Sequence, residues 1–442
     1  MDKMNHRLLS VLSATALLAG TAVSSAQDFS AGLEVRARYD STHELPNDKR
    51  GQSADSDYER LRTRVWGKYQ DQDNGLTLFI RLANEFRNYH HPSANSSKQR
   101  FPDVLFIDNL YVQYDNLLGG DLSLKLGRQD ISFGRKRIIS DGTGGDGSRS
   151  AYFDALRLTW RPAASQSLDA FAIYVHNNDL LPTLGKEHAN HKRPSDYDVT
   201  GYGQNEYGAG LYWQDRTAES FGWDAYYVFK GEHRRESSKY YKEGEDVQTH
   251  TAGFRILPKF SQYLRGEVEA AMQVGSNSLA AQMAYGGLTF LPKADDSLEL
   301  TAAVLYLSGD HDGARGSSAW HQVFNRDTGI GETIAPMYTK YGYTNLVYPH
   351  LAADLKFGRP GKLHLEGGAM LTAVREDAAD GRNRGSFLQA KYSVNLGKLS
   401  KCKALDGVSA AVTGEILQRG DYFKDDGGGL AAFGRLELAW KF

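Results

Sequence analysis

Apolar and polar side chains alternate with a period of two residues along most of this chain. In the segment 263–275, for example, Val268 and Met272 alternate with Glu267 and Glu269. A helix would spread the charged residues around its circumference, whereas an extended strand puts them on one face. The pattern therefore predicts strands with one apolar and one polar face, which is typical of strands that cross a membrane.

Segments with this alternation recur about eighteen times, each about ten residues long or slightly longer. We place them at residues 29–42, 57–70, 75–88, 103–115, 121–130, 150–160, 168–178, 204–215, 221–232, 247–257, 263–275, 278–291, 296–308, 346–357, 361–374, 384–396, 405–418 and 429–442. The connections after even-numbered strands are short, such as 71–74 and 216–220. Most connections after odd-numbered strands are long, such as 131–149 and 309–345, although 276–277 is an exception.

Short turns that alternate with long loops are the pattern of bacterial outer-membrane barrels. We therefore expect an all-β fold, in which residues 27–442 form one transmembrane, antiparallel, up-and-down β-barrel. An even number of strands puts both ends of the barrel on the side of the short turns, which is the periplasm.

The first residues have the features of an export signal. Lys3 and Arg7 lie in a basic start, an apolar stretch follows at residues 8–19, and small residues precede Gln27. This order is typical of a secretory signal peptide, and the apolar stretch is too short to span a bilayer. We expect residues 1–26 to be a signal peptide that is removed before Gln27.

Composition agrees with a barrel. The chain has 46 Gly, 25 Tyr and 19 Phe but only 11 Pro, and glycine and aromatic residues are abundant in such folds. The single cysteine, Cys402, excludes an internal disulfide framework and a thiolate metal cluster. It lies in 398–403, which is expected to be a tight turn. The net charge of −2 gives no indication of a nucleic-acid partner.

The last segment has its apolar residues on one face and ends in an aromatic residue. Leu436, Leu438, Trp440 and Phe442 alternate with polar residues. This ending resembles the terminal strand by which the barrel-assembly machinery recognises outer-membrane proteins. We therefore expect that machinery as a partner during biogenesis, and outer-membrane lipid and lipopolysaccharide around the finished barrel.

The polar faces of the early strands are rich in arginine. The inward positions are Arg36, Arg38, Arg60, Arg62, Arg64, Arg81, Arg87, Arg128 and Arg157. On adjacent strands they would form a positive ladder along a pore, and guanidinium binds carboxylate through a planar fork. Alternatively, each arginine pairs with a wall acid and stiffens the barrel. Candidate acids are Glu34, Glu85, Asp108, Asp154, Glu267 and Glu269.

A basic segment follows the fifth strand. It begins Gly127-Arg128-Gln129-Asp130 and continues through Phe133-Gly134 to Arg137, and four glycines follow within residues 142–147. Nucleotide binding is a weak interpretation of these glycines, because no Gly-Lys-Ser/Thr ends them and a strand follows them instead of a helix. We expect the loop to fold inward as a constriction.

This segment, together with Phe153-Asp154-Ala155-Leu156-Arg157, resembles a block found in the alginate-export family of outer-membrane porins. The resemblance implies an eighteen-stranded barrel whose positive pore passes an anionic polyuronate to the cell exterior. It also implies a constriction that includes Arg128, Arg135, Arg137 and Arg157, with Asp130 and Asp154 as its acidic counterpart. The inward residues Arg62, Arg64 and Arg81 are expected to extend this solute path.

Other functions have less support in the sequence. The histidines lie mostly in loops, no His-Glu-x-x-His or calcium-loop motif occurs, and we expect neither catalytic residues, nor a metal, nor a cofactor. The sequence predicts a channel for an anionic carbohydrate, an alginate-like polyuronate or a related acidic sugar. The alternative is a plugged barrel that serves as an adhesin or structural receptor through the long loops 178–203 and 309–345.

Overall fold

The computed structural model describes residues 27–46, 53–90, 105–140, 152–177, 179–184, 204–234, 246–293, 295–311, 317–325, 329–334, 343–358, 360–377, 379, 381–423 and 429–442. The expected signal peptide, residues 1–26, lies outside them. All statements about the structure concern these residues.

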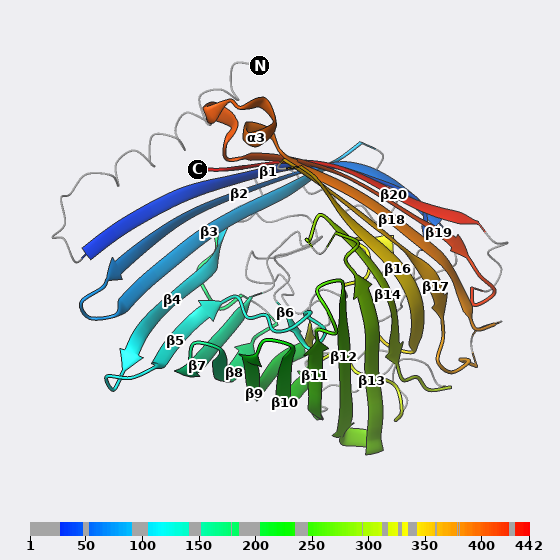
Figure 1. Ribbon diagram of the computed structural model, residues 1–442, viewed down its shortest axis with the longest axis horizontal. Coiled ribbons are helices and arrows are strands. Elements are labelled where there is room, and N and C mark those ends of the chain that lie inside the picture. The colour runs from blue at the N-terminus through cyan, green and yellow to red at the C-terminus, as the bar shows by residue number, and fades with distance from the viewer. Residues whose placement is uncertain are drawn as a thin grey trace.

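An eighteen-stranded antiparallel sheet forms the described part of the molecule. Each strand pairs with the next one along the chain, and β1 pairs with both β2 and β20, which closes the sheet into a barrel (Figure 1). The strands are β1 (Gln27–Pro46), β2 (Ser53–Asp71), β3 (Leu76–Tyr89), β4 (Leu105–Leu117), β5 (Leu122–Gln129), β7 (Phe153–Ala163), β8 (Gln166–Val175), β9 (Gln204–Ala218), β10 (Phe221–Arg234), β11 (Asp246–Pro258), β12 (Leu264–Gly275), β13 (Leu279–Phe290), β14 (Leu298–Leu307), β16 (Leu346–Phe357), β17 (Gly361–Leu371), β18 (Asn383–Asn395), β19 (Val408–Arg419) and β20 (Leu430–Lys441).

Alternation along each strand separates the two faces of the barrel. Leu78, Val268 and Leu388 are exposed on the outside, whereas Arg62 and Glu269 are buried on the inside. The apolar outer face is stable in contact with lipid, and the polar inner face is stable in contact with a hydrated lumen. This is the arrangement of a transmembrane barrel. The prediction of about eighteen closed, antiparallel strands is confirmed.

One correction to the strand bounds concerns the connection before β19. We expected that strand to start at residue 405, but α3 (Leu396–Ser400) and a short 3-10 turn, Lys403–Leu405, precede it. The side chain of Asn395 accepts a hydrogen bond from the backbone N–H of Lys398, which caps the helix and begins it directly after β18. In the described part of the chain, no helix has the length and apolar character needed to cross a membrane.

Two loop segments lie inside the barrel. One is 131–140, which follows β5 and contains β6 (Ile139–Ser140). The other is described at 317–325, which contains β15 (Phe324–Asn325), and at 329–334, and the two short strands pair in parallel. Figure 1 shows β6 within the ring of strands. Phe133 stacks on Tyr212 of β9, with ring centroids 4.5 Å apart. The described part of the loop after β5 therefore folds inward, as expected, and narrows the lumen.

Candidate solute-binding cavity in the lumen

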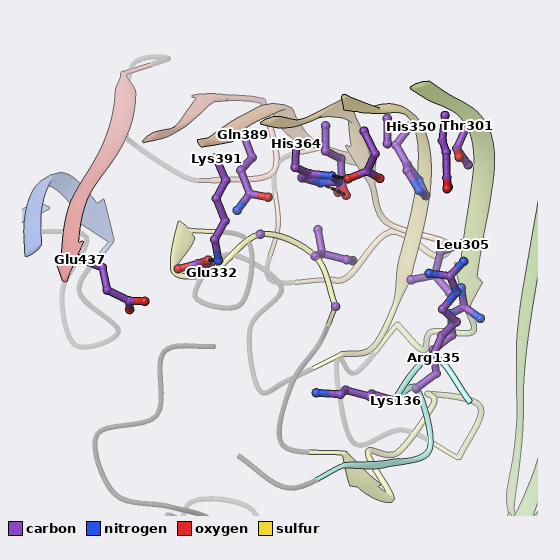
Figure 2. Close-up of a pocket in the computed structure, with 18 of the residues that line it drawn as sticks. Arg135, Lys136, Thr301, Leu305, Glu332, His350, His364, Gln389, Lys391 and Glu437 are labelled. Carbon is purple, nitrogen blue, oxygen red and sulfur yellow. Dashed lines mark hydrogen bonds and ion pairs between the residues drawn. The ribbon is translucent and has the colours of Figure 1, made fainter. Parts of the chain in front are cut away.

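A cavity of about 720 Å³ remains between the barrel wall and the inward segments. Its lining comes from β1, β2, β13, β14, β16 to β20 and the two inward segments, and Figure 2 shows part of it. Of the described residues that line it, eight are Lys or Arg and six are Asp or Glu. The cavity is strongly polar, with a small excess of positive charge when histidine is taken as neutral.

Three arginines of neighbouring strands form one side of the cavity. Arg36 of β1 lies directly opposite Arg62 of β2 in the strand register, and Arg38 is two residues further along β1. Like charges in opposite positions repel, and wall acids offset this repulsion. Arg62 donates to Glu34 at 2.7 Å, and Arg36 donates to Glu85 at 3.3 Å.

Arg38 has an equivalent partner on the next strand, because it donates to Glu437 of β20. Pairing with wall acids, the alternative considered for the arginine ladder, therefore does occur at these positions. The pairs hold the guanidinium groups at fixed places along the edge of the cavity. A guanidinium has five N–H donors, and the side chains of Arg36, Arg38 and Arg62 are 5, 5 and 8 % exposed at this edge.

Aromatic side chains lie on another part of the lining. His350 stacks on Tyr348 with ring centroids 4.6 Å apart and 12° between the planes. The Tyr348 hydroxyl donates to Glu366 at 2.8 Å. His364 lies between two acids, 3.1 Å from Asp354 and 3.6 Å from Glu366. Strands β16 and β17 thus present the partly exposed rings of His350 and His364 beside carboxylates that already have partners.

The inward segment after β5 brings two of the predicted arginines to the cavity. Arg137 donates to Glu267 at 2.8 Å and to Glu269 at 2.6 Å, and its guanidinium lies 3.6 Å from the ring centroid of Tyr285. Arg135 also donates to Glu267, at 3.0 Å, but its side chain is 63 % exposed. Arg137 therefore attaches the segment to β12, whereas Arg135 is the more accessible charge.

Arg128 lies in a different environment from the one expected of a solute-path residue. Its side chain is 1 % exposed and donates to Asp154 at 2.9 and 3.1 Å and to Asp179 at 2.9 Å. Its guanidinium also lies 3.5 Å from the ring centroid of Tyr152. This is the geometry of a clamp between strand and loop, and Arg128 does not line the cavity.

Five further residues of the expected path lie outside the described lining of this cavity. Arg64 and Arg81 both bind Asp108, at 3.0 and 2.6 Å, and Arg81 also donates to Asp130 at 3.2 Å. Arg157 donates to Asp169 at 2.8 Å. Of the nine residues expected in the path, the structure brings Arg62, Arg135 and Arg137 together at this cavity. The other six are Arg64, Arg81, Arg128, Arg157, Asp130 and Asp154.

The cavity is also lined by charged residues that were not predicted from the sequence to lie on the solute path. Lys391 was placed on the polar face of its strand, but nothing distinguished it from other polar wall positions. Glu332 lies in the long segment 309–345, which has no periodic pattern. Figure 2 shows Lys391 pointing at Glu332, with which it forms an ion pair.

A closed barrel with an apolar outer face and a polar lumen narrowed by inward segments defines the class of outer-membrane porins. The family described as alginate export matches residues 27–381, and the chain belongs to that family. Its place is the bacterial outer membrane.

Solved structures of Pseudomonas porins have the same fold. OccK9 (OpdG) of Pseudomonas aeruginosa superposes with a TM-score of 0.63 at 13% identity, covering 94% of this chain and 98% of that one. OccK11 (OpdR) of the same organism gives 0.58 at 12% identity, covering 94% and 96%. A BenF-like porin from Pseudomonas fluorescens Pf-5 gives 0.60 at 9% identity, covering 94% and 98%. No curated protein matches the chain.

Proposed function

We propose that this porin passes an anionic carbohydrate, an alginate-like polyuronate or a related acidic sugar, through its arginine-lined lumen. The observation that carries the proposal is the row of Arg36, Arg38 and Arg62 along one side of a cavity of about 720 Å³. Arg135 and Lys391 extend the basic surface to the inward segment and to β18. A solute with several carboxylates can exchange between such groups as it moves.

Conduction needs binding that is favourable but weak, at several sites along the path. The wall acids contribute to this balance, because each arginine has a carboxylate partner with which the carboxylate of a solute must compete. The partly exposed ring of His350, which stacks on the buried Tyr348, offers a flat surface to the C–H face of a sugar ring. A uronate, which has both a carboxylate and a ring, uses both kinds of surface.

Transport of this kind requires no catalytic residue, cofactor or metal. Lipid and lipopolysaccharide surround the apolar outer face, and the strand that ends at Trp440-Lys441-Phe442 is offered to the barrel-assembly machinery. The proposal places both ends of the barrel in the periplasm; it is supported by the position of α3 at the same end as the C-terminus (Figure 1), because short connections are periplasmic in this class.

A second function is favoured by the packing inside the barrel. Trp320, Phe324 and Ile334 are buried, and Gln273 of β12 exchanges hydrogen bonds with the backbone of His321 at 2.7 and 2.9 Å. An inner segment held this firmly is also what a plugged barrel would have. Such a barrel would serve as an adhesin or receptor through its outer loops.

Recordings from the purified protein in planar lipid bilayers separate the two functions. A channel for acidic sugars gives a reversal potential that favours anions in a KCl gradient, and its current is blocked by trigalacturonate more than by neutral maltotriose. Block weakens as salt rises, because charges are screened beyond about 8 Å at physiological ionic strength. Conductance without anion preference or uronate block would overturn the proposal, and the lack of any conductance would favour the plugged barrel.

A further inference from the structure

Glu332 is a loop residue whose carboxylate occupies a basic site on the wall. One of its oxygens accepts from Lys391 of β18, and the other accepts from Nη1 of Arg435 of β20 at 2.6 Å. Both bases belong to the barrel wall, whereas Glu332 belongs to the inward segment that follows β15. The carboxylate thus bridges two strands that are separated in the sheet by β19.

The backbone of the same segment is held by an acid of β19. The N–H groups of Glu332, Thr333 and Ile334 all donate to the carboxylate of Glu415, the last two at 3.1 and 2.8 Å. Gly331 has a φ of +60°, and a Cβ there would lie 2.7 Å from Phe387 and 2.9 Å from the Glu415 carboxylate. The backbone is therefore fixed independently of the Glu332 side chain, which can leave its partners without releasing the segment.

The two bases differ in how a solute can reach them. Lys391 is 41 % exposed and lines the cavity, so it is accessible from the solute path. Arg435 is only 2 % exposed and is not among the described residues that line the cavity, whereas Glu332, to which it donates, is. Arg435 donates through Nε and Nη2 to Asp40 at 2.6 and 3.0 Å, which fixes its orientation and leaves Nη1 directed at Glu332. A carboxylate that replaced Glu332 would meet a base already in place.

We infer that Lys391 and Arg435 form a carboxylate-binding site of the solute path, and that Glu332 is its built-in occupant, with which the carboxylate of a passing anion competes. This inference rests on the proposed function and adds residues that the arginine-rich early strands do not supply. The competition between Glu332 and the solute carboxylate limits how tightly the site can hold a solute. A lysine and an arginine without a counter-charge would hold an acidic solute too long, whereas an exchange of one carboxylate for another keeps the net binding weak.

The test removes the charge of the occupant and keeps its shape. In planar bilayers, Glu332→Gln is expected to lower the trigalacturonate concentration that gives half-maximal block by about fivefold, the factor that corresponds to one partly exposed ion pair. Glu299→Gln is the matched control, because Glu299 lines the same cavity and pairs with Arg265 instead of this site. Glu299→Gln changes the formal charge of the cavity by the same amount as Glu332→Gln. It is expected to change the trigalacturonate concentration for half-maximal block by less than about twofold.

A second substitution tests whether the effect acts through the site. In the double variant Glu332→Gln with Lys391→Met, the gain of the single variant is expected to shrink, because only Arg435 of the two bases remains. Lys391→Met alone is expected to weaken the block by trigalacturonate. Because it leaves Glu332 unchanged, it tests the site even if Glu332→Gln prevents folding. Heat-modifiable migration in gels checks that each variant forms a barrel.

The outcomes separate the inference from the proposed function. If the wild type lacks anion preference and uronate block, both fall. If the wild type is blocked but Glu332→Gln has no larger effect than Glu299→Gln, only the inference falls. The inference is also overturned if the gain persists undiminished in the double variant, or if trigalacturonate blocks Lys391→Met as strongly as the wild type.

Discussion

Arg137, eight residues beyond the end of β5, donates through one nitrogen to both Glu267 and Glu269 of β12, at 2.8 and 2.6 Å. Glu267 also accepts from Arg255 of β11 at 3.0 Å. The inward segment is therefore attached to a part of the wall far from the strand that carries it. Since the same segment lines the cavity, this attachment sets the width of the lumen.

Replacement of Arg137 by alanine should release the segment without unfolding the barrel. A hydrogen bond to a charged group contributes about 1.5–3 kcal/mol, and Glu267 keeps Arg255 as a partner. We expect chymotrypsin to cleave the variant after Phe133, whose ring is stacked on Tyr212 in the intact protein. Lys136→Ala, on the same segment, is the control and should stay protected. If Arg137→Ala is equally protected, the apolar side chains Ile138 and Ile139 hold the segment instead.

The barrel was predictable because strand alternation is a local property of the sequence. Each residue of a pleated strand faces opposite to its neighbours, so the apolar Val268 and the acidic Glu267 could be assigned to opposite faces without knowledge of any partner. The alternating connection lengths then fixed the orientation of the strands. Even the inward position of Arg62 followed from this reasoning, and the structure places it at the cavity.

The contents of the lumen were not predictable in the same way. Arg137 and Glu267 are 130 residues apart, and no local pattern pairs a loop residue with a strand on another part of the wall. Gly127, with a φ of +121°, is followed by an Arg128 that is buried against Asp179 instead of facing the cavity. Glu332 lies in a segment without periodicity, so its contact with Lys391 depends on a loop fold that the sequence does not specify.

Arg128 should matter for stability more than for selectivity. Removing one partner of a buried ion pair costs about 3–5 kcal/mol because it leaves an uncompensated charge. Arg128→Met would leave Asp154 and Asp179 without this guanidinium. We expect a loss of that order in the free energy of unfolding, measured by urea titration in lipid vesicles. Arg135→Met removes an exposed arginine and should cost less than about 1 kcal/mol. Equal costs would mean that the Arg128 contacts contribute no more than a surface pair.

The outward face can be tested with lysine at two positions near the middle of their strands. Leu388 of β18 is 50 % exposed on the outside of the barrel, whereas Ala352 of β16 lines the cavity. Lysine on the lipid face near the bilayer midplane costs about 2–4 kcal/mol. We therefore expect Leu388→Lys to lower the free energy of unfolding in vesicles by that amount and Ala352→Lys to change it little. If Ala352→Lys lowered the free energy of unfolding more than Leu388→Lys, the assignment of the two faces would be wrong.

Reversal of charge at Arg135 should change selectivity and leave the barrel intact. Arg135 is the most accessible of the predicted arginines that line the cavity, and its single described ion pair is with Glu267, which keeps two other arginine partners. Arg135→Glu introduces a negative charge into the cavity, so we expect the reversal potential in a KCl gradient to move toward cation preference. The shift should be larger at 0.01 M than at 1 M salt, because the screening length falls from about 30 Å to about 3 Å. Arg135→Gln should give a smaller shift in the same direction. An unchanged reversal potential for Arg135→Glu at low salt would mean that ions pass along a different part of the lumen, and it would remove Arg135 from the solute path.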